Sequence, residues 1–142
     1  MGRVEYLEPW HFVEWGAPFV PNDIVGYAMR GDDGSLICLG GVWFIEGRAW
    51  ATFDSRGKPP PRVHGLGAKL LQTVKSIGVN AVWAELDESK PAARKWLERF
   101  GFERHSINEI GIEVWRIDLQ DWSLRAQIRN GRTMRKSLSS EA

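Results

Sequence analysis

Short apolar stretches separated by turn residues predict a sheet-rich first half of the chain. Strands are expected at residues 4–7, 24–29, 36–45 and 49–53. The turn residues in Gly31–Gly34 and Glu46–Arg48 join the last three of these strands, which therefore form an antiparallel meander. Between the first two strands the chain is apolar, but Pro9, Pro18 and Pro21 interrupt it, so we expect only one or two short helices there.

Helices and strands alternate in the second half. Apolar residues recur at helical spacing from Leu66 to Ile77, and Gly78 follows as a helix stop. Beyond it the pattern predicts a strand at 81–86, a helix from Ser89 to Gly101, and a hairpin of strands 102–107 and 112–119. A strand–helix–strand unit requires a parallel pair beside these antiparallel ones. We therefore expect an α/β (α+β) fold, with a mixed central sheet of about six to seven strands flanked by helices and with abbreviated N-terminal helices.

Length and charge divide the chain into a body and a tail. The 142 residues, 43% of them hydrophobic, suit one domain, which we place at residues 1–120. Residues 121–142 are expected to be a basic C-terminal tail that is partly disordered. From residue 122 onward five basic residues stand against one acid, a net charge of +4 that leaves −3 for residues 1–121 of the total of +1. Solvated chain ends are commoner than nucleic-acid arms, so nucleic acid is disfavoured as a partner and would bind only through this tail.

Several classes of protein are disfavoured by what the sequence contains. No stretch approaches the roughly 20 apolar residues of a membrane span, and the N-terminal residues lack the apolar run of a secretory signal. We therefore expect a cytoplasmic protein with no membrane partner. The single cysteine, Cys38, lies in an apolar run and is interpreted as an inert core thiol. One thiol cannot build a multi-thiolate site, and we expect no metal.

The segment Arg62–Gly67, which reads Arg-Val-His-Gly-Leu-Gly, lies between a predicted strand and a predicted helix. Glycines at a helix start let the backbone approach a ligand closely, and the helix dipole favours negative charge there. The segment therefore predicts an anion site, with a helix-entry turn that binds nothing as the alternative. Its spacing is too short for a Walker loop, and a dinucleotide-binding pattern would need a third glycine where Leu70 stands.

Two stretches of the sequence resemble the GNAT N-acetyltransferases. The hallmark of that family is Gln/Arg-x-x-Gly-x-Gly/Ala at the junction of its fourth strand and third helix, and Arg62, Gly65 and Gly67 occupy the three defining places. Lys90–Phe102 resembles the family's fourth helix and its Gly-Phe exit into the sixth strand, with Ala93, Gly101 and Phe102 matching. The resemblance covers roughly residues 24–119.

The resemblance implies an acyl-CoA-dependent N-acetyltransferase with acetyl-CoA as cosubstrate. It places coenzyme A against eight residues: Phe53, Arg62, Val63, His64, Gly65, Leu66, Gly67 and Ala68. The amides of Val63–Ala68 would bind its pyrophosphate, and the pantetheine arm would run between the strand ending near Asp54 and the strand at 81–86. A primary amine, on a small molecule or a protein, would then attack the thioester directly. A homodimer is a further implication, although no residue locates an interface.

The sequence departs from the family at the residue that often protonates the departing thiolate. That tyrosine, four residues before the Gly-Phe, is replaced by Leu97, and Lys90 stands where the family commonly has an asparagine. Loss of a general acid costs about 10²-fold or more in rate rather than all activity. The alternative function is therefore a catalytically weak or inactive GNAT-fold binding or structural protein, whose partner completes or replaces the acceptor site.

Carboxylates near the implied cleft are the candidates for the base that takes a proton from the amine. We rank Glu85 first and Asp54 second, and Asp87 shares a face with Glu85 by strand alternation. The alternative for each is an ordinary surface acid. His64 is expected to contact a phosphate or to be exposed.

Eight tryptophans are the unusual feature of the composition, and Trp43, Trp50, Trp83 and Trp115 fall one on each of four predicted strands. They predict either a core of large rings or an aromatic-lined acceptor pocket for a flat or cationic substrate.

Overall fold

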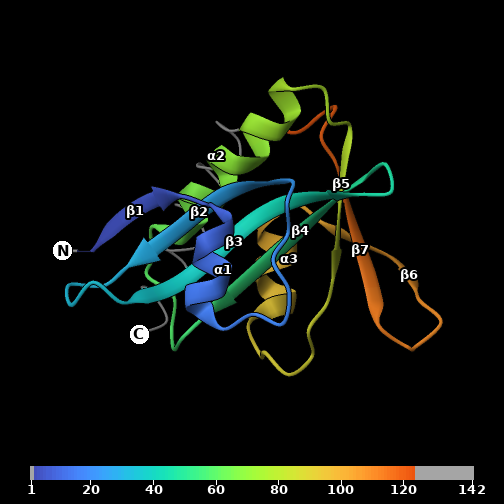
Figure 1. The fold of residues 1–142 in the computed structure, drawn as a ribbon. Helices are drawn as coiled ribbons and strands as arrows, with labels where there is room; N and C mark the ends of the chain where they lie inside the picture. The colour runs from blue at the N-terminus through green and yellow to red at the C-terminus, as the bar shows by residue number, and fades with distance from the viewer. Residues whose placement is uncertain (1, 124–142) are drawn as a thin grey trace, which may run out of the picture. The chain divides into compact units, whose positions relative to one another are not determined.

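The computed structural model describes residues 2–123, and Figure 1 shows the course of the chain. These residues form seven strands and three helices, and the predicted α/β fold with a seven-stranded sheet is confirmed. They divide into two compact units, residues 2–70 and 71–123, and each unit is described by itself. The elements in chain order are β1 (Arg3–Tyr6), α1 (Pro9–Trp15), β2 (Ile24–Arg30), β3 (Leu36–Ile45), β4 (Arg48–Ser55), α2 (Val63–Ser76), β5 (Ala81–Glu85), α3 (Ala93–Phe100), β6 (Glu103–Ile107) and β7 (Glu113–Asp118).

The first unit is built on the antiparallel sheet β1-β2-β3-β4, in which β2, β3 and β4 form the predicted meander and β1 pairs with β2. Gly34 and Gly47 take positive φ angles of 84° and 80° in the two turns, a conformation that glycine adopts without strain. Gly26 pairs with Gly41 between β2 and β3, and a Cβ built on Gly26 would lie 2.1 Å from the Gly40 carbonyl oxygen. Glycine at Gly26 is therefore what permits the two backbones to pair.

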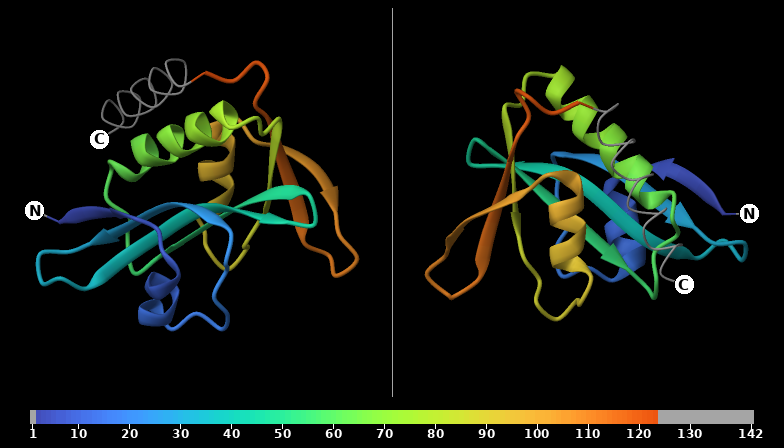
Figure 2. Two further views of the ribbon diagram at one scale, coloured as in Figure 1. Left: turned by 45° about the horizontal axis from the view of Figure 1, so that its top comes forward. Right: turned by 180° about the vertical axis from the view of Figure 1, so that it is seen from behind.

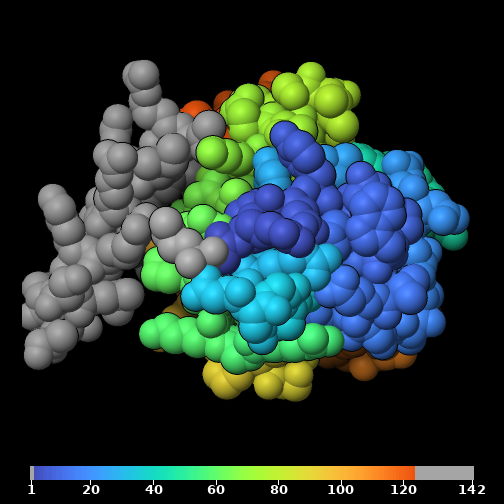
Figure 3. Space-filling view, turned by 60° about the vertical axis from the view of Figure 1, so that its left-hand side comes forward, coloured from blue at the N-terminus to red at the C-terminus, as the bar shows by residue number. Residues whose placement is uncertain are grey.

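The helix α1 lies on one face of this sheet, as the views in Figure 2 show. Beneath it a small apolar core contains Leu7, Ala28, Leu36 and Leu39, all buried, with Phe12, Trp15 and Ile24 packed against them. In Figure 3 the blue surface of the N-terminal segment adjoins the cyan surface of the β2–β3 hairpin, in keeping with the pairing of β1 with β2. Burial of this apolar surface, at about 25 cal/mol per Å², is the main force that holds the short helix in place.

A chain of polar contacts also attaches α1 to β1 and β2. The Glu8 amide donates to His11 Nδ1 at 2.9 Å, which leaves the ring proton on Nε2, and Nε2 donates to Glu5 at 2.9 Å. Arg30 donates to Glu5 at 3.0 Å and to Glu14 at 2.7 Å. The His11 hydrogen bond, followed by Arg30, lowers the pKa of Glu5 to about 2. Glu5 therefore stays ionised below the pH at which an ordinary glutamate becomes protonated.

The second unit contains the antiparallel order β5-β7-β6, in which Ala84 pairs with Trp115. Gly101 ends α3 with a φ of 99°, and the Phe102 amide donates back to the Leu97 carbonyl at 2.9 Å, as expected for a glycine helix stop. Trp122 is buried, and Lys75 Nζ donates to its carbonyl at 2.6 Å. Of the expected basic tail at residues 121–142, residues 124–142 lie outside the described chain.

Two further features of residues 2–123 concern membranes and metal ions. None of the helices among these residues is both long enough and apolar enough to cross a membrane. Within the same range no group of three or more His, Cys, Asp or Glu side chains is placed to hold a metal ion. Cys38 is buried, and burial raises the pKa of its thiol to about 11, so it is a core thiol as predicted.

Candidate functional site

The glycine motif lies inside the first turns of α2 rather than in a loop before it. Periodicity predicted a helix from Leu66, but α2 begins at Val63, and the Leu66 amide donates to the Arg62 carbonyl at 3.1 Å. The first N–H groups of a helix have no carbonyl within it, whereas those that follow donate to the residue four positions back. The Val63 amide donates to the Pro60 carbonyl at 3.1 Å. The Gly65 amide therefore comes just before the Leu66 amide in the chain, whereas Gly67 comes after it. Of the two motif glycines, Gly65 is the one at the N-terminal end of the helix.

The space in front of Gly65 is open. A Cβ built on Gly65 meets no atom within 4 Å among the placed residues. The N-terminal end of a helix carries roughly half a positive charge and unsatisfied donors, so an anion can approach the backbone at this point. Arg62 is exposed at the same end, and its Nη2 donates to the Gly2 carbonyl at 3.3 Å. Geometry and charge thus both suit an anionic group.

The other residues expected to contact coenzyme A differ in exposure. The side chain of His64 is 2% exposed, so the expectation that it lies in solvent is wrong. Val63 and Ala68 are also buried, and their side chains belong to the packing of the helix. Phe53 is half-exposed on β4, where it pairs with Gly40.

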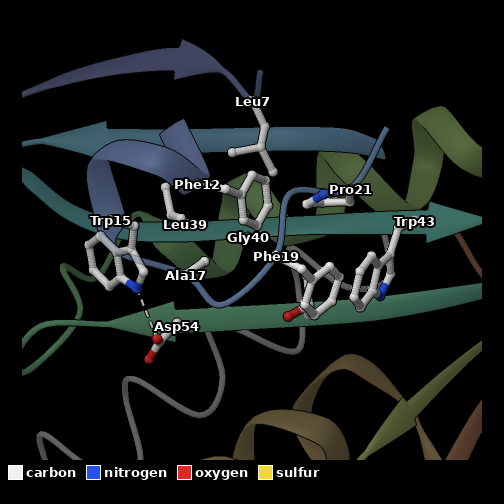
Figure 4. Close-up of a pocket in the computed structure, with 11 residues that line it drawn as sticks. Leu7, Phe12, Trp15, Ala17, Phe19, Pro21, Leu39, Gly40, Trp43 and Asp54 are labelled. Carbon is white, nitrogen blue, oxygen red and sulfur yellow. Dashed lines mark hydrogen bonds between the residues drawn. The ribbon is translucent and has the colours of Figure 1, made fainter. Parts of the chain in front are cut away.

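An apolar cavity of about 210 Å³ lies in the first unit, between α1, the segment after it, and strands β3 and β4 (Figure 4). The register places Asp54 opposite Leu39 and Trp50 opposite Trp43, so the cavity follows the two strands lengthwise. Its walls are mostly aromatic and aliphatic, and Asp54 is the one charged residue among those that line it. The lining residues are Leu7, Phe12, Trp15, Ala17, Phe19, Pro21, Leu39, Gly40, Trp43, Thr52 and Asp54.

Asp54 is held at one end of the cavity by two hydrogen bonds. Trp15 Nε1 donates to Oδ2 at 3.0 Å, drawn as the dashed line in Figure 4, and the Ser55 amide donates to Oδ1 at 2.9 Å. Arg56 donates to the Trp15 carbonyl at 3.0 Å and places its guanidinium 4.0 Å from the centre of the Trp15 ring. The carboxylate is thus fixed in orientation by a ring that is distant in sequence.

Glu85, which the sequence ranks above Asp54, lies in a different setting. It is exposed at the end of β5 in the second unit, where it pairs with Val114. Strand alternation predicts that Glu85 shares a face with Trp83, and the alternating burial along β5 agrees. Alternation does not predict how deeply the side chain is buried. Asp87 lies beyond the strand, and its Oδ1 accepts from the Ser89 amide at 3.0 Å. Asp54 is the carboxylate that the structure encloses among apolar side chains.

The tryptophans divide between core and cavity. Of the four on strands, Trp115 is buried, whereas Trp43, Trp50 and Trp83 are only half-buried. Trp43 stacks on Phe19 at 5.0 Å between ring centres, with 14° between the planes, and this pair forms the end of the cavity away from Asp54. Each alternative therefore holds for part of the set: Trp115 belongs to the core, and Trp43 lines an aromatic pocket.

The sequence pattern does not identify Phe12, Trp15 and Phe19 as site residues. Their signal was the apolar density of the segment before β2, but its prolines removed the periodicity that would have assigned a face. Leu97, which stands in the place of the family's tyrosine, lies half-buried in α3, so the predicted helix is present with leucine at that position.

Comparisons with known proteins bear on the fold. By sequence, no family model and no curated protein match the chain. Among solved structures, the chain is similar to a GNAT-family acetyltransferase from Staphylococcus aureus, with a TM-score of 0.65 and 8% identity over 84% of this chain and 100% of that one. It is also similar to a ribosomal-protein alanine N-acetyltransferase from Escherichia coli, with a TM-score of 0.60 and 13% identity over 87% of this chain and 97% of that one.

A third similar structure is a GNAT phosphinothricin acetyltransferase from Sinorhizobium meliloti in complex with acetyl-CoA. Its TM-score is 0.61 and its identity 10%, over 82% of this chain and 88% of that one. These likenesses define the class of fold: the chain has the GNAT N-acetyltransferase fold, as the two sequence motifs predicted.

Proposed function

We propose that the protein is an acyl-CoA-dependent N-acetyltransferase that moves the acetyl group of acetyl-CoA to a primary amine. The observation that supports this proposal is the N-terminal end of α2, where the Gly65 amide precedes the first helical hydrogen bond and a Cβ at Gly65 would meet open space. A phosphate group is the anion that we propose for this end. The helix belongs to a fold that in another protein is seen in complex with acetyl-CoA.

The residues present fit the cosubstrate. The pyrophosphate would lie against the first amides of α2, with Arg62 adding a positive charge at the same end. Phe53, half-exposed on β4, is the proposed contact for the acyl-bearing arm. His64, Leu66, Gly67 and Ala68 contribute through the helix that they form rather than through exposed side chains.

The chemistry needs a group that accepts a proton from the amine. The amine nitrogen forms a C–N bond with the thioester carbonyl, the C–S bond breaks, and the electron pair leaves on the sulfur of coenzyme A. A bound ammonium gives up two protons in all, one to a base and one to the departing thiolate. We propose Asp54 as the base, directly or through water, because it is enclosed in the cavity, with Glu85 as the second candidate. Leu97 offers no proton, so the thiolate takes its proton from water or from the amine.

Calorimetric titration with acetyl-CoA and with free coenzyme A tests this proposal. The wild-type protein is expected to bind both at micromolar concentration, and a Gly65→Asp, Gly67→Asp double variant is expected to lose that binding. Release of free thiol in the presence of an amine panel then measures transfer. If the folded wild-type protein binds neither compound, the proposed function is wrong.

The second candidate function is a GNAT-fold binding protein without turnover, and Leu97 is the observation that favours it. The two functions differ in one measurement. The amines tested should differ in size and include protein N-termini. If acetyl-CoA binds but none of these amines releases thiol faster than acetyl-CoA hydrolyses in buffer, the binding protein is favoured.

A further inference from the structure

The cavity beside α1 has one polar end and one aromatic end. Asp54 and the indole N–H of Trp15 lie at the first, and the stacked rings of Phe19 and Trp43 form the second, as Figure 4 shows. Four residues of β4 separate Asp54 from the position that pairs with Trp43, about 13 Å at the usual strand rise. A molecule that fills this space would therefore present different chemistry at its two ends.

The size of the cavity limits what can occupy it. Its volume of about 210 Å³ is below the roughly 300–1,000 Å³ of pockets for drug-sized ligands. An apolar cavity of about 150 Å³ is enough for benzene. The space thus fits one ring with a short chain, and a larger molecule would extend out of it.

The charge of the cavity points to a cation. Asp54 is the only charged residue among those that line the cavity, so the charge that a ligand meets there is negative. Arg56, which does not line the cavity, already lies over the Trp15 ring. The attraction for a ligand cation therefore comes from Asp54, while Phe19 and Trp43 offer flat surfaces for an apolar group.

We propose that the cavity binds an arylalkylamine, a primary ammonium carried by a short chain on one flat ring, with the ammonium at Asp54 and the ring against Phe19 and Trp43. Within the proposed transferase function, on which this assignment of a substrate rests, the molecule is the acetyl acceptor. The ammonium loses one proton to Asp54 before its nitrogen attacks the thioester. The products are the N-acetyl amide, the free thiol of coenzyme A and one proton in solution.

Three probes separate charge from ring in binding experiments without acetyl-CoA. Phenylethylamine carries both features, phenylethanol keeps the ring without the charge, and butylamine keeps the charge without the ring. In calorimetry, phenylethylamine is expected to bind at least tenfold more tightly than either of the others, since a hydrogen bond to a charged group alone contributes about tenfold to hundredfold. Equal binding of phenylethanol or of butylamine would overturn the proposal.

Two variants assign each feature to its residue. Asp54→Asn keeps an oxygen that can accept from Trp15, and it is expected to abolish the advantage of phenylethylamine over phenylethanol. Phe19→Ala changes a side chain that is 56% exposed, so the fold should survive, and it is expected to abolish the advantage over butylamine. Asp33→Asn, in the exposed turn after β2, removes the same charge elsewhere and serves as the matched control. An equal effect of Asp33→Asn would refute the assignment to Asp54.

A titration of acetyl-CoA into the same samples distinguishes this inference from the proposed function. Acetyl-CoA binding without phenylethylamine binding would overturn the arylalkylamine assignment and leave the transferase proposal standing. Amine binding with the expected pattern, but no acetyl-CoA binding, would support the cavity and remove the transferase. A short peptide whose free N-terminus displaces phenylethylamine and binds more tightly would also overturn the arylalkylamine class.

Discussion

Gly65 allows the proposed anion site to be tested without damage to α2. It is the third residue of α2, and a Cβ at this position meets no atom within 4 Å among residues 2–123. Gly65→Ala should therefore stabilise the fold by up to about 1 kcal/mol through helix propensity. Gly65→Asp should also be tolerated, because an acid in the first turn of a helix contributes about 0.3–1 kcal/mol of favourable dipole interaction.

The two substitutions have opposite consequences for an anionic ligand. Two like charges 4 Å apart repel by about 1 kcal/mol in bulk water and by about 4 kcal/mol at the effective dielectric constant near a protein surface. Gly65→Asp should thus weaken acetyl-CoA binding by between about fivefold and about a thousandfold. Gly65→Ala adds one methyl group in open space, and its affinity should stay within about threefold of wild type.

Calorimetry at two salt concentrations makes the test specific for charge. The screening length falls from about 10 Å at 0.1 M salt to about 3 Å at 1 M, so the penalty from the aspartate should shrink at high salt. A thermally stable Gly65→Asp protein that binds acetyl-CoA as wild type does would show that the pyrophosphate does not lie at α2. If Gly65→Ala weakens binding as much as Gly65→Asp does, the cause is steric, and the electrostatic argument is wrong.

Two further predictions concern stability. The pKa of Glu5 is depressed to about 2, first by the His11 hydrogen bond and then by Arg30. Ionised Glu5 therefore stabilises the fold at pH values above its unfolded-state pKa of about 4.5, and this stabilisation is lost as the pH falls toward 2. The urea midpoint of the wild-type protein should decrease over that pH range, and the midpoint of Glu5→Gln should decrease less. The same dependence on pH in both proteins would contradict this prediction. Gly26→Ala would bring a Cβ to 2.1 Å from the Gly40 oxygen. It should cost about 1–3 kcal/mol or more in chemical denaturation, whereas a wild-type midpoint would show that the strands can separate at no cost.

Local patterns were sufficient for most elements of the fold. The apolar run at 36–45 predicted β3 to its terminal residues, and Gly78 and Gly101 marked two helix ends because both adopt positive φ angles. The start of α2 is an exception, because apolar periodicity begins at Leu66 whereas the helix begins at Val63. Its first turn contains His64, a polar residue that tertiary packing buries.

The candidate cavity could not be derived in the same way. The contact between Trp15 and Asp54 joins residues 39 positions apart, and it exists because α1 docks on the apolar core under the sheet. The local hydrogen bond of Asp54, from the Ser55 amide, gives no indication of its long-range contact with Trp15. The contact of His11 with Glu5 is closer in sequence, but it too requires the helix to turn back on the strand before it. Sequence spacing predicts the face of an element, whereas docking decides which faces meet.

The packing of α1 against the sheet also changes the ranking of the two candidate bases, Glu85 and Asp54. Strand alternation placed Glu85 first, but it is exposed, whereas Asp54 shares a cavity with aromatic rings. If Asp54 both holds the ammonium and takes its proton, Asp54→Asn must raise KM for the amine and also lower kcat, because one group serves the ground state and the transition state. A variant that changed only KM would assign the proton to another base. A larger loss of kcat from Glu85→Gln than from Asp54→Asn would restore the order that the sequence suggested.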